Sequence, residues 1–220
     1  MNHPFFTLAP PEQKRIQLKL AAAFIGFNLI AGSLLFVIGL VPLIPFVFAF
    51  SLSVFAPFVD CPSGVKAGNL IYYSPLLVGE KIKKNRLVLH AGSLFDYYFV
   101  LDKDQSARER KKFVYQNYTQ GLLAVIEEFE SQRPTQITIK ATSYILNPRT
   151  AKKLGLELVQ TDILQRVILY FNFINLTFAS SLLNKKLTWP KMNKIYTFEG
   201  KLDVLIEKKD ELIALQAKLM

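Results

Sequence analysis

The stretch LAAAFIGFNLIAGSLLFVIGLVPLIPFVFAFSLSVFAPFV, Leu20 to Val59, contains 40 residues without one charged side chain. An uncharged apolar run of about 18 residues or more is typical of a membrane segment, whereas the apolar core of a secretory signal has only about 7 to 15 residues. A single helix of this length would measure about 60 Å, roughly twice the hydrocarbon thickness of a bilayer. The chain therefore has to turn within the stretch.

The segment Val41-Pro42-Leu43-Ile44-Pro45 predicts the position of that turn. Each proline removes a backbone donor and disfavours helix at the residue before it. We expect a cytosolic tail at residues 1–18 and a transmembrane helical hairpin at residues 19–59, with arms at about 19–40 and 45–59. Because the second arm is short, a re-entrant hairpin that does not cross the bilayer is the alternative.

Cations flank the apolar stretch on both sides, and the turn between its arms has none. They are Lys14, Arg15 and Lys19 before the stretch, and Lys66, Lys81, Lys83, Lys84 and Arg86 after it. Lys and Arg concentrate on the cytoplasmic side of membrane segments. Both the N-terminus and the C-terminal domain are therefore predicted to lie in the cytoplasm, whether the hairpin spans the bilayer or re-enters it.

The net charge of +10 is concentrated after the hairpin, since residues 1–59 hold three cations and one carboxylate and leave +8 for residues 60–220. A basic domain beside a membrane is attracted to anionic headgroups by about 1 kcal/mol per well-placed cation. The lipid bilayer is thus the predicted partner. The chain has no nucleic-acid recognition motif, so nucleic acid is not expected. The sequence does not determine the oligomeric state.

Cysteine and histidine are scarce, which limits the chemistry of the chain. Cys61 is the single cysteine, and His3 and His90 are the two histidines. A disulfide framework and a zinc site built from cysteine or histidine are therefore excluded, and no metal is expected.

Residues 60–68 are rich in turn-forming residues and are predicted to link the hairpin to a cytosolic domain at residues 69–220. Strand-like runs follow at residues 69–78 and 87–101, the second broken at Ala91-Gly92-Ser93 and continued by a strand at residues 95–101. These patterns predict an α+β (α/β) fold with a mixed or antiparallel sheet.

Helix signals divide the rest of the domain. The capping box Ser106 to Glu109 begins a helix predicted to end near residue 132. A strand follows at residues 136–146. Asn147-Pro148 then begins a short helix that Gly155 ends. Residues 163–183 predict an apolar helix, either in the core or on a membrane surface. A strand at 195–198 and a terminal helix complete the domain.

Residues 118–159, YTQGLLAVIEEFESQRPTQITIKATSYILNPRTAKKLGLELV, resemble the second half of a GNAT-type (N-acetyltransferase-like) domain. That family has a helix, a strand and a helix that begins with Asn, in this order. The last helix ends in a sequence similar to Lys153-Leu154-Gly155-Leu156. In the family, the strand and the Asn lie beside the pantetheine arm of acyl-CoA. The resemblance therefore implies a GNAT-like fold, acyl-CoA as cofactor, and Thr142, Ser143 and Asn147 as cofactor-binding residues.

The chain departs from that family before the long helix. The family has a glycine-rich turn there, and its backbone N–H groups bind the pyrophosphate. Residues 102–120 of this chain contain no glycine. Arg108, Arg110, Lys111 and Lys112 supply charge at this place, but not the close approach of backbone that glycine permits.

His90, Ser93 and Asp96 are the most enzyme-like group and the candidate catalytic residues. Histidine can act as a general base, a carboxylate can orient it, and serine can act as a nucleophile. On a flat strand His90 and Asp96 would lie about 20 Å apart, so a sharp turn has to bring them together. The alternative is that both bond the backbone around that turn.

Two further sets of candidates have structural alternatives. Thr142, Ser143 and Asn147 are also explained by strand polarity and a helix cap. The candidate lipid or phosphate contacts are also explained as solvated faces; they are Arg108, Arg110, Lys111, Lys112, Arg149 and Lys152.

The apolar stretch predicts a membrane anchor, and the GNAT resemblance implies an acyltransferase acting on a membrane-associated amine or alcohol. The alternative is a non-enzymatic membrane protein whose basic domain binds lipid headgroups or a protein partner.

Overall fold

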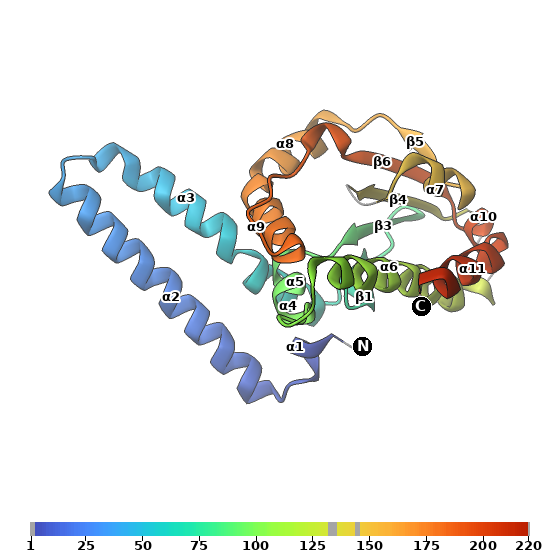
Figure 1. Cartoon of the computed structure of the whole chain (residues 1–220), viewed down its shortest axis with the longest axis horizontal. Helices are drawn as coiled ribbons and strands as arrows, with labels where there is room; N and C mark the ends of the chain where they lie inside the picture. Colours follow the sequence, from blue (N-terminus) through green and yellow to red (C-terminus); the bar gives the residue numbers. More distant parts are fainter. Residues whose placement is uncertain (1–2, 132–135, 144–145, 220) are drawn as a thin grey trace.

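The computed structural model describes residues 3–131, 136–143 and 146–219. Its centre is a six-stranded mixed sheet in the order β1-β2-β3-β4-β6-β5 (Figure 1). Strands β3 and β4 pair in parallel, and the other neighbours pair antiparallel. The expected mixed α/β class is therefore confirmed. The strands are β1 (Leu70–Ser74), β2 (Leu77–Glu80), β3 (Arg86–Ala91), β4 (Thr138–Ser143), β5 (Glu157–Val159) and β6 (Tyr196–Lys201).

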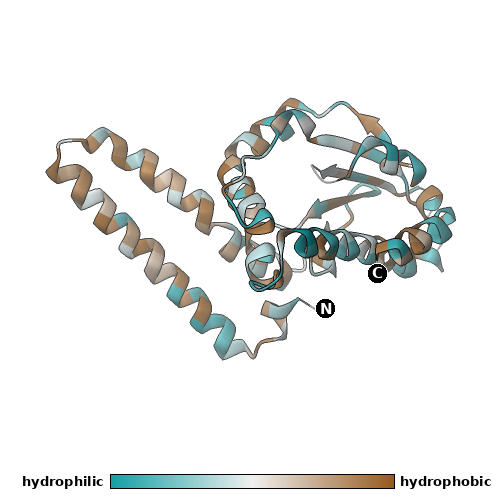
Figure 2. Ribbon diagram, in the orientation of Figure 1, coloured by the Kyte–Doolittle hydropathy of each residue, from teal (hydrophilic) through white to brown (hydrophobic). Residues whose placement is uncertain are grey.

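Helix α2 (Pro10–Val37) is long and apolar enough to cross a membrane. It begins about nine residues before the predicted arm, because Pro10 suits the first helical turn and Glu12 accepts the Ala9 N–H at 3.3 Å. After the short 3-10 turn η1 (Val41–Leu43), helix α3 (Ile44–Phe55) runs back beside α2 (Figure 1). Figure 2 shows that both helices are predominantly apolar.

Residues 60–66 are helical, although the sequence predicted a turn-rich linker there. Helix α4 (Pro57–Lys66) follows α3 after a bend of 45°. Pro57 occupies a first-turn position that tolerates proline, and Pro62 inside the helix is buried together with Phe58. Burial against the domain therefore outweighs the local cost of proline. Gly68, at φ +69°, turns the chain into β1.

The strand predicted at residues 95–101 is wrong, because this segment forms helix α5 (Leu94–Val100). Asp96 Oδ2 accepts the backbone N–H of Ser93 at 2.5 Å, which is the carboxylate half of a capping box. The aromatic residues that favour a strand in isolation are packed here on a helix, with Phe95 and Tyr97 buried.

Helices α6 (Ala107–Glu130) and α7 (Pro148–Lys153) begin at their predicted caps. Ser106 Oγ accepts the N–H of Glu109 at 3.3 Å, and Asn147 Oδ1 accepts the N–H of Thr150 at 2.9 Å. The apolar segment predicted as one helix is two helices, α8 (Ile163–Phe171) and α9 (Phe173–Asn184), bent by 61°. The remaining elements are α1 (Pro4–Thr7), η2 (Met192–Lys194), α10 (Leu202–Glu207) and α11 (Lys209–Leu219).

The two faces of the sheet differ in polarity. Leu87, Leu89 and Ile139 of the apolar face are buried against α6, α10 and α11. Successive side chains alternate across a strand, so the neighbouring positions His90, Lys140 and Thr142 face the opposite way. This polar face looks toward α8, as the shared surroundings of His90, Thr142 and Gln165 show.

Candidate functional site

A cavity of about 490 Å³ lies between the polar face of the sheet and the bent pair α8–α9. Helices α4 and α5 close one side of it. Five of the residues predicted from the sequence as catalytic or cofactor-binding line this one cavity: His90, Ser93, Asp96, Thr142 and Ser143. The fold therefore gathers predicted residues from two separate segments of the chain, 90–96 and 142–143, at one place.

His90 pairs with Glu80 across the β2–β3 hairpin. Nε2 of His90 lies 2.7 Å from Glu80 Oε1, and both side chains are 43% exposed. Because an ionised carboxylate only accepts hydrogen bonds, Nε2 carries a proton in this pair, and in the neutral imidazole Nδ1 is then the nitrogen with the lone pair. This arrangement of a histidine oriented by a carboxylate suits a general base. The orienting residue is Glu80, in place of the predicted Asp96.

The carboxyl ends of the parallel strands β3 and β4 meet beside this pair. His90 is opposite Thr142 in the register, and Ala91 and Ser143 follow. A second, apolar cavity of about 300 Å³ on the α6 side is lined by the same four residues. The strand ends are therefore accessible from both faces of the sheet, a position where α/β proteins commonly bind ligands.

The predicted cofactor-binding residues also have structural partners. Thr142 Oγ1 lies 3.1 Å from Thr197 Oγ1, and Ser143 Oγ accepts the N–H of Leu146 at 3.0 Å. Asn147 caps α7 and lines the apolar cavity, not the polar one. Thr142 and Ser143 thus lie between the two cavities, and Asn147 lies at the edge of the apolar one.

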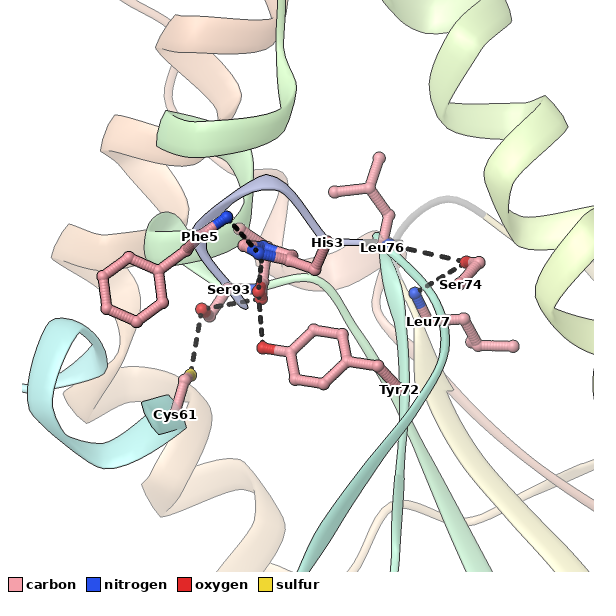
Figure 3. Close-up of polar contacts among 9 residues, drawn as sticks. His3, Phe5, Cys61, Tyr72, Ser74, Leu76, Leu77 and Ser93 are labelled. Carbon is pink, nitrogen blue, oxygen red and sulfur yellow. Dashed lines mark hydrogen bonds and ion pairs between the residues drawn. The ribbon is translucent and has the colours of Figure 1, made fainter. Parts of the chain in front are cut away.

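Ser93 and Asp96 line the larger cavity and belong to one polar cluster. Figure 3 shows Ser93, Cys61, Tyr72 and His3 of this cluster. Asp96 is 1% exposed, and its carboxylate accepts the hydroxyl protons of Tyr72 at 2.6 Å and Ser93 at 2.9 Å. Cys61 Sγ lies 3.4 Å from Ser93 Oγ. The cluster stabilises a buried carboxylate with directed hydrogen bonds, which is the condition for burying such a charge.

His3 completes this cluster, although no pattern in the sequence pointed to it. Its imidazole is fully buried, and Nε2 lies 3.2 Å from Asp96 Oδ1, off the line that a hydrogen bond requires. Nδ1 accepts the N–H of Phe5 at 3.2 Å, so the proton is on Nε2 and the ring is neutral. The ring also stacks on Phe95, with centroids 5.2 Å apart.

Tyr72 remains a hydrogen-bond donor over a wide pH range. Burial raises the pKa of its hydroxyl well above the ordinary value, and the negative charge of Asp96 raises it further. A phenolate beside a buried carboxylate would be strongly unfavourable. Tyr72 therefore serves to hold Asp96 as a hydrogen-bond donor.

Asn175 of α9 places an unpaired acceptor at the cavity. The residue is 7% exposed, and its Nδ2 donates to the carbonyl oxygen of Ser53 in α3 at 2.6 Å. Its Oδ1 finds no hydrogen-bond partner in the described part of the chain. A buried polar atom without a partner costs free energy, so an N–H or O–H donor that reached this buried oxygen would be stabilising.

The predicted cationic contacts separate into two kinds. Arg110 is buried and donates to the carbonyl oxygens of Asp102 at 2.9 Å, Lys103 at 3.0 Å and Leu182. Its guanidinium therefore fastens the start of α6 to α9 and does not face a headgroup. The other five predicted residues are exposed on α6 and α7: Arg108, Lys111, Lys112, Arg149 and Lys152.

The chain matches no protein-family model, no curated protein and no solved structure. Within residues 3–131, 136–143 and 146–219, no group of three or more His, Cys, Asp and Glu side chains is placed to hold a metal ion. The residues that line the two cavities are therefore the basis for a functional proposal.

Proposed function

We propose that this chain is a membrane-anchored, GNAT-like acyltransferase that moves an acyl group from a thioester donor to a membrane-associated amine or alcohol. The observation that carries the proposal is the His90–Glu80 pair beside the carboxyl ends of β3 and β4. The pair supplies a general base, and the strand ends supply a place where a ligand can approach from both faces of the sheet.

The order of elements in residues 118–159 supports the same proposal. Helix α6, strand β4 and the Asn-capped helix α7 follow one another as the GNAT resemblance implies, and Gly155 follows α7 at φ +73°. The apolar cavity beside Thr142, Ser143 and Asn147 would take the pantetheine arm and acyl chain of acyl-CoA. The larger polar cavity would take the acceptor.

The proposed reaction uses the residues of the larger cavity in named roles. His90 Nδ1 takes the proton of the amine or alcohol as its nitrogen or oxygen bonds to the thioester carbonyl carbon. The C–S bond then breaks, and the leaving thiolate takes that proton from the His90 imidazolium, so the products are an amide or ester and a free thiol, and His90 is neutral again. Asn175 Oδ1 orients the acceptor, and Glu80 stabilises the imidazolium that forms.

The membrane part of the proposal rests on α2 and its partner α3. We propose that they form a hairpin in the bilayer with both ends on the cytoplasmic side, since the flanking cations favour that orientation. Asn175 lines the larger cavity and is hydrogen-bonded to Ser53 of α3, so the cavity adjoins the domain end of α3. The acceptor substrate would then enter the cavity from the membrane.

Calorimetry on the full chain in lipid nanodiscs tests the donor. Titration with acetyl-CoA and with a long-chain acyl-CoA is expected to give saturable heat, and free coenzyme A is the matched control for the acyl group. If neither thioester binds at millimolar concentration, the transferase proposal fails. The non-enzymatic alternative, in which the exposed cations of α6 and α7 bind headgroups, would then be preferred.

A further inference from the structure

Helix α8 presents an apolar face that no described residue covers. Exposed fractions on this face are 81% for Ile163, 70% for Leu164 and 76% for Phe171, and none of the nine residues of α8 is buried. On a helical wheel these three positions share one side with Val167 and Tyr170. Such a contiguous apolar surface marks a contact with another apolar phase.

The opposite side of α8 faces the protein. Gln165, Ile168 and Leu169 line the 490 Å³ cavity, so α8 forms one wall of it. The helix therefore has a cavity side and an outer side. Packing against the rest of the protein explains the residues of the cavity side, but not why the outer side is apolar. The outer side requires a separate explanation.

The end of α8 is attached to the apolar helix α3, which points to the bilayer as the phase that covers its outer side. Ser53 of α3 donates its hydroxyl to the carbonyl oxygen of Phe171 at 3.3 Å, and Asn175 at the start of α9 donates to the Ser53 carbonyl at 2.6 Å. These bonds join the α8–α9 bend to the domain end of α3. The C-terminal end of α8 thus meets the domain end of α3, and α9 packs against α3. Figure 2 shows that α3 itself is predominantly apolar.

The segment after α9 has the composition of a membrane boundary. Leu187 and Trp189 are 72% and 62% exposed, and the Trp189 ring stacks on Phe173 with centroids 5.9 Å apart. Lys185, Lys186 and Lys191 are exposed around them. Tryptophan and lysine are enriched where headgroups meet acyl chains.

We propose that α8 and Trp189 lie in the headgroup boundary of the same leaflet that α2 enters, with the outer face of α8 inserted among the acyl chains. Helix α8 then separates the bilayer from the 490 Å³ cavity. This inference rests on membrane insertion of α2 but not on the transfer reaction. A second copy of the chain as the covering partner is an outcome that the experiment distinguishes.

Trp189 is the single tryptophan of the chain, so it reports its own depth without substitution. The full chain is reconstituted in phosphatidylcholine–phosphatidylglycerol vesicles that contain lipids brominated at shallow or deep acyl positions. The expected result is stronger quenching by shallow bromines and protection from aqueous acrylamide. Quenching by acrylamide with no response to brominated lipid would overturn the proposal.

Environment-sensitive dyes on introduced cysteines test α8 directly in a Cys61→Ser background. Leu164→Cys and Phe171→Cys probe the outer face, Ile30→Cys on α2 is the membrane control, and Lys153→Cys on α7 is the aqueous control. All four positions are exposed, so the fold should be retained, and far-UV circular dichroism checks this. Emission at 164 and 171 should be blue-shifted and quenched by brominated lipid, as at 30.

The controls separate the two ways in which the proposal can fail. If the dye at 30 responds to brominated lipid and those at 164 and 171 behave like that at 153, α8 is not in the membrane although α2 is. If the dyes at 164 and 171 are blue-shifted without quenching by brominated lipid, a protein surface covers α8. If the dye at 30 also lies in water, membrane anchoring fails as well.

Discussion

His3 Nε2 lies 3.2 Å from Asp96 Oδ1, which joins the N-terminal tail to the first turn of α5. Both side chains are almost completely buried, and Phe5, two residues after His3, packs in one cluster with Phe95 and Phe58. The tail is therefore part of the core, and His3 lies beside Asp96, which lines the cavity.

His3→Phe should destabilise the protein while keeping the aromatic stacking on Phe95. The phenyl ring cannot accept the Phe5 N–H or contact Asp96 with a polar atom, so the expected loss is about 1–3 kcal/mol in free energy of unfolding. Thermal and denaturant unfolding of the full chain in detergent measure it. Phe6→Leu, which retains an apolar side chain and removes no hydrogen bond, is the control; equal losses in both variants would contradict a polar role for His3.

Tyr72 should make the protein sensitive to alkaline pH. Its pKa is raised in the folded state by burial first and by Asp96 second, relative to an ordinary value of 10.0. Below pH 10 the hydroxyl is protonated in both states, so its contribution to stability is complete. Above pH 10 the unfolded phenol ionises and the folded one does not, so the free energy of unfolding falls.

Stability measured from about pH 8 to about pH 11 in wild type and Tyr72→Phe tests this dependence. The variant is expected to start less stable by about 1.5–3 kcal/mol, the range for hydrogen bonds to charged groups. It should then lose less stability than wild type as the pH rises. Parallel pH profiles for the two proteins would show that Tyr72 does not contribute.

His90→Ala should abolish the proposed transfer while leaving the fold intact. General acid–base catalysis contributes about 10²- to 10⁴-fold, and that is the expected fall in kcat. Because the pair with Glu80 is 43% exposed, its removal should cost less than about 1 kcal/mol in stability. Glu80→Gln should reduce kcat less, since histidine remains. A His90→Ala protein with full activity would exclude His90 as the base.

Asn147→Ala separates capping from ligand binding. Loss of the cap should cost about 1 kcal/mol in stability, and Asn147→Ser or Asn147→Asp should restore most of it, because both residues cap helices. If Asn147 acts only as a cap, affinity for acyl-CoA will be the same in all three variants. If it also contacts the donor, affinity will fall even in the variants with restored stability.

Gly121→Ala should be destabilising, although alanine usually stabilises a helix interior by about 1 kcal/mol relative to glycine. A methyl group at this position would lie 2.7 Å from Leu77 Cβ and 2.9 Å from Ser74 Oγ, at the contact of α6 with the β1–β2 turn. Gly26→Ala in α2 is the matched control, since a methyl group added there would meet no atom within 4 Å. Denaturant unfolding of both variants should give opposite signs.

Local signals in the sequence predicted the helices that begin with a cap. The side chains of Ser106 and Asn147 each accept the backbone N–H of the residue three positions later. The signal that predicts the start of the helix therefore lies within four consecutive residues. The Ser93 to Asp96 spacing is a signal of the same kind, but the β-forming aromatic residues after it led to the wrong prediction of a strand. The capping pattern was the stronger signal there.

Partners distant in the chain could not be predicted in the same way. The Glu80–His90 pair depends on the register of the β2–β3 hairpin, in which His90 is opposite Val78 and diagonal to Glu80. A charged turn at residues 80–86 was predicted, and Lys84 and Asn85 form it with φ of 51° and 57°, but the turn alone does not specify which side chains pair across the hairpin. The contact of His3 with Asp96 depends on how the whole tail packs.

The apolar helices are fixed to the domain at two places. The tail before α2 is held by His3 and Phe5, and the end of α3 is held by Ser53 and by α4, which continues into β1. A domain attached to a membrane hairpin at one point can rotate above the bilayer. A domain attached at both ends of the hairpin has a fixed tilt and a fixed height relative to the bilayer. The cavity would therefore keep a constant distance and direction from the lipid surface.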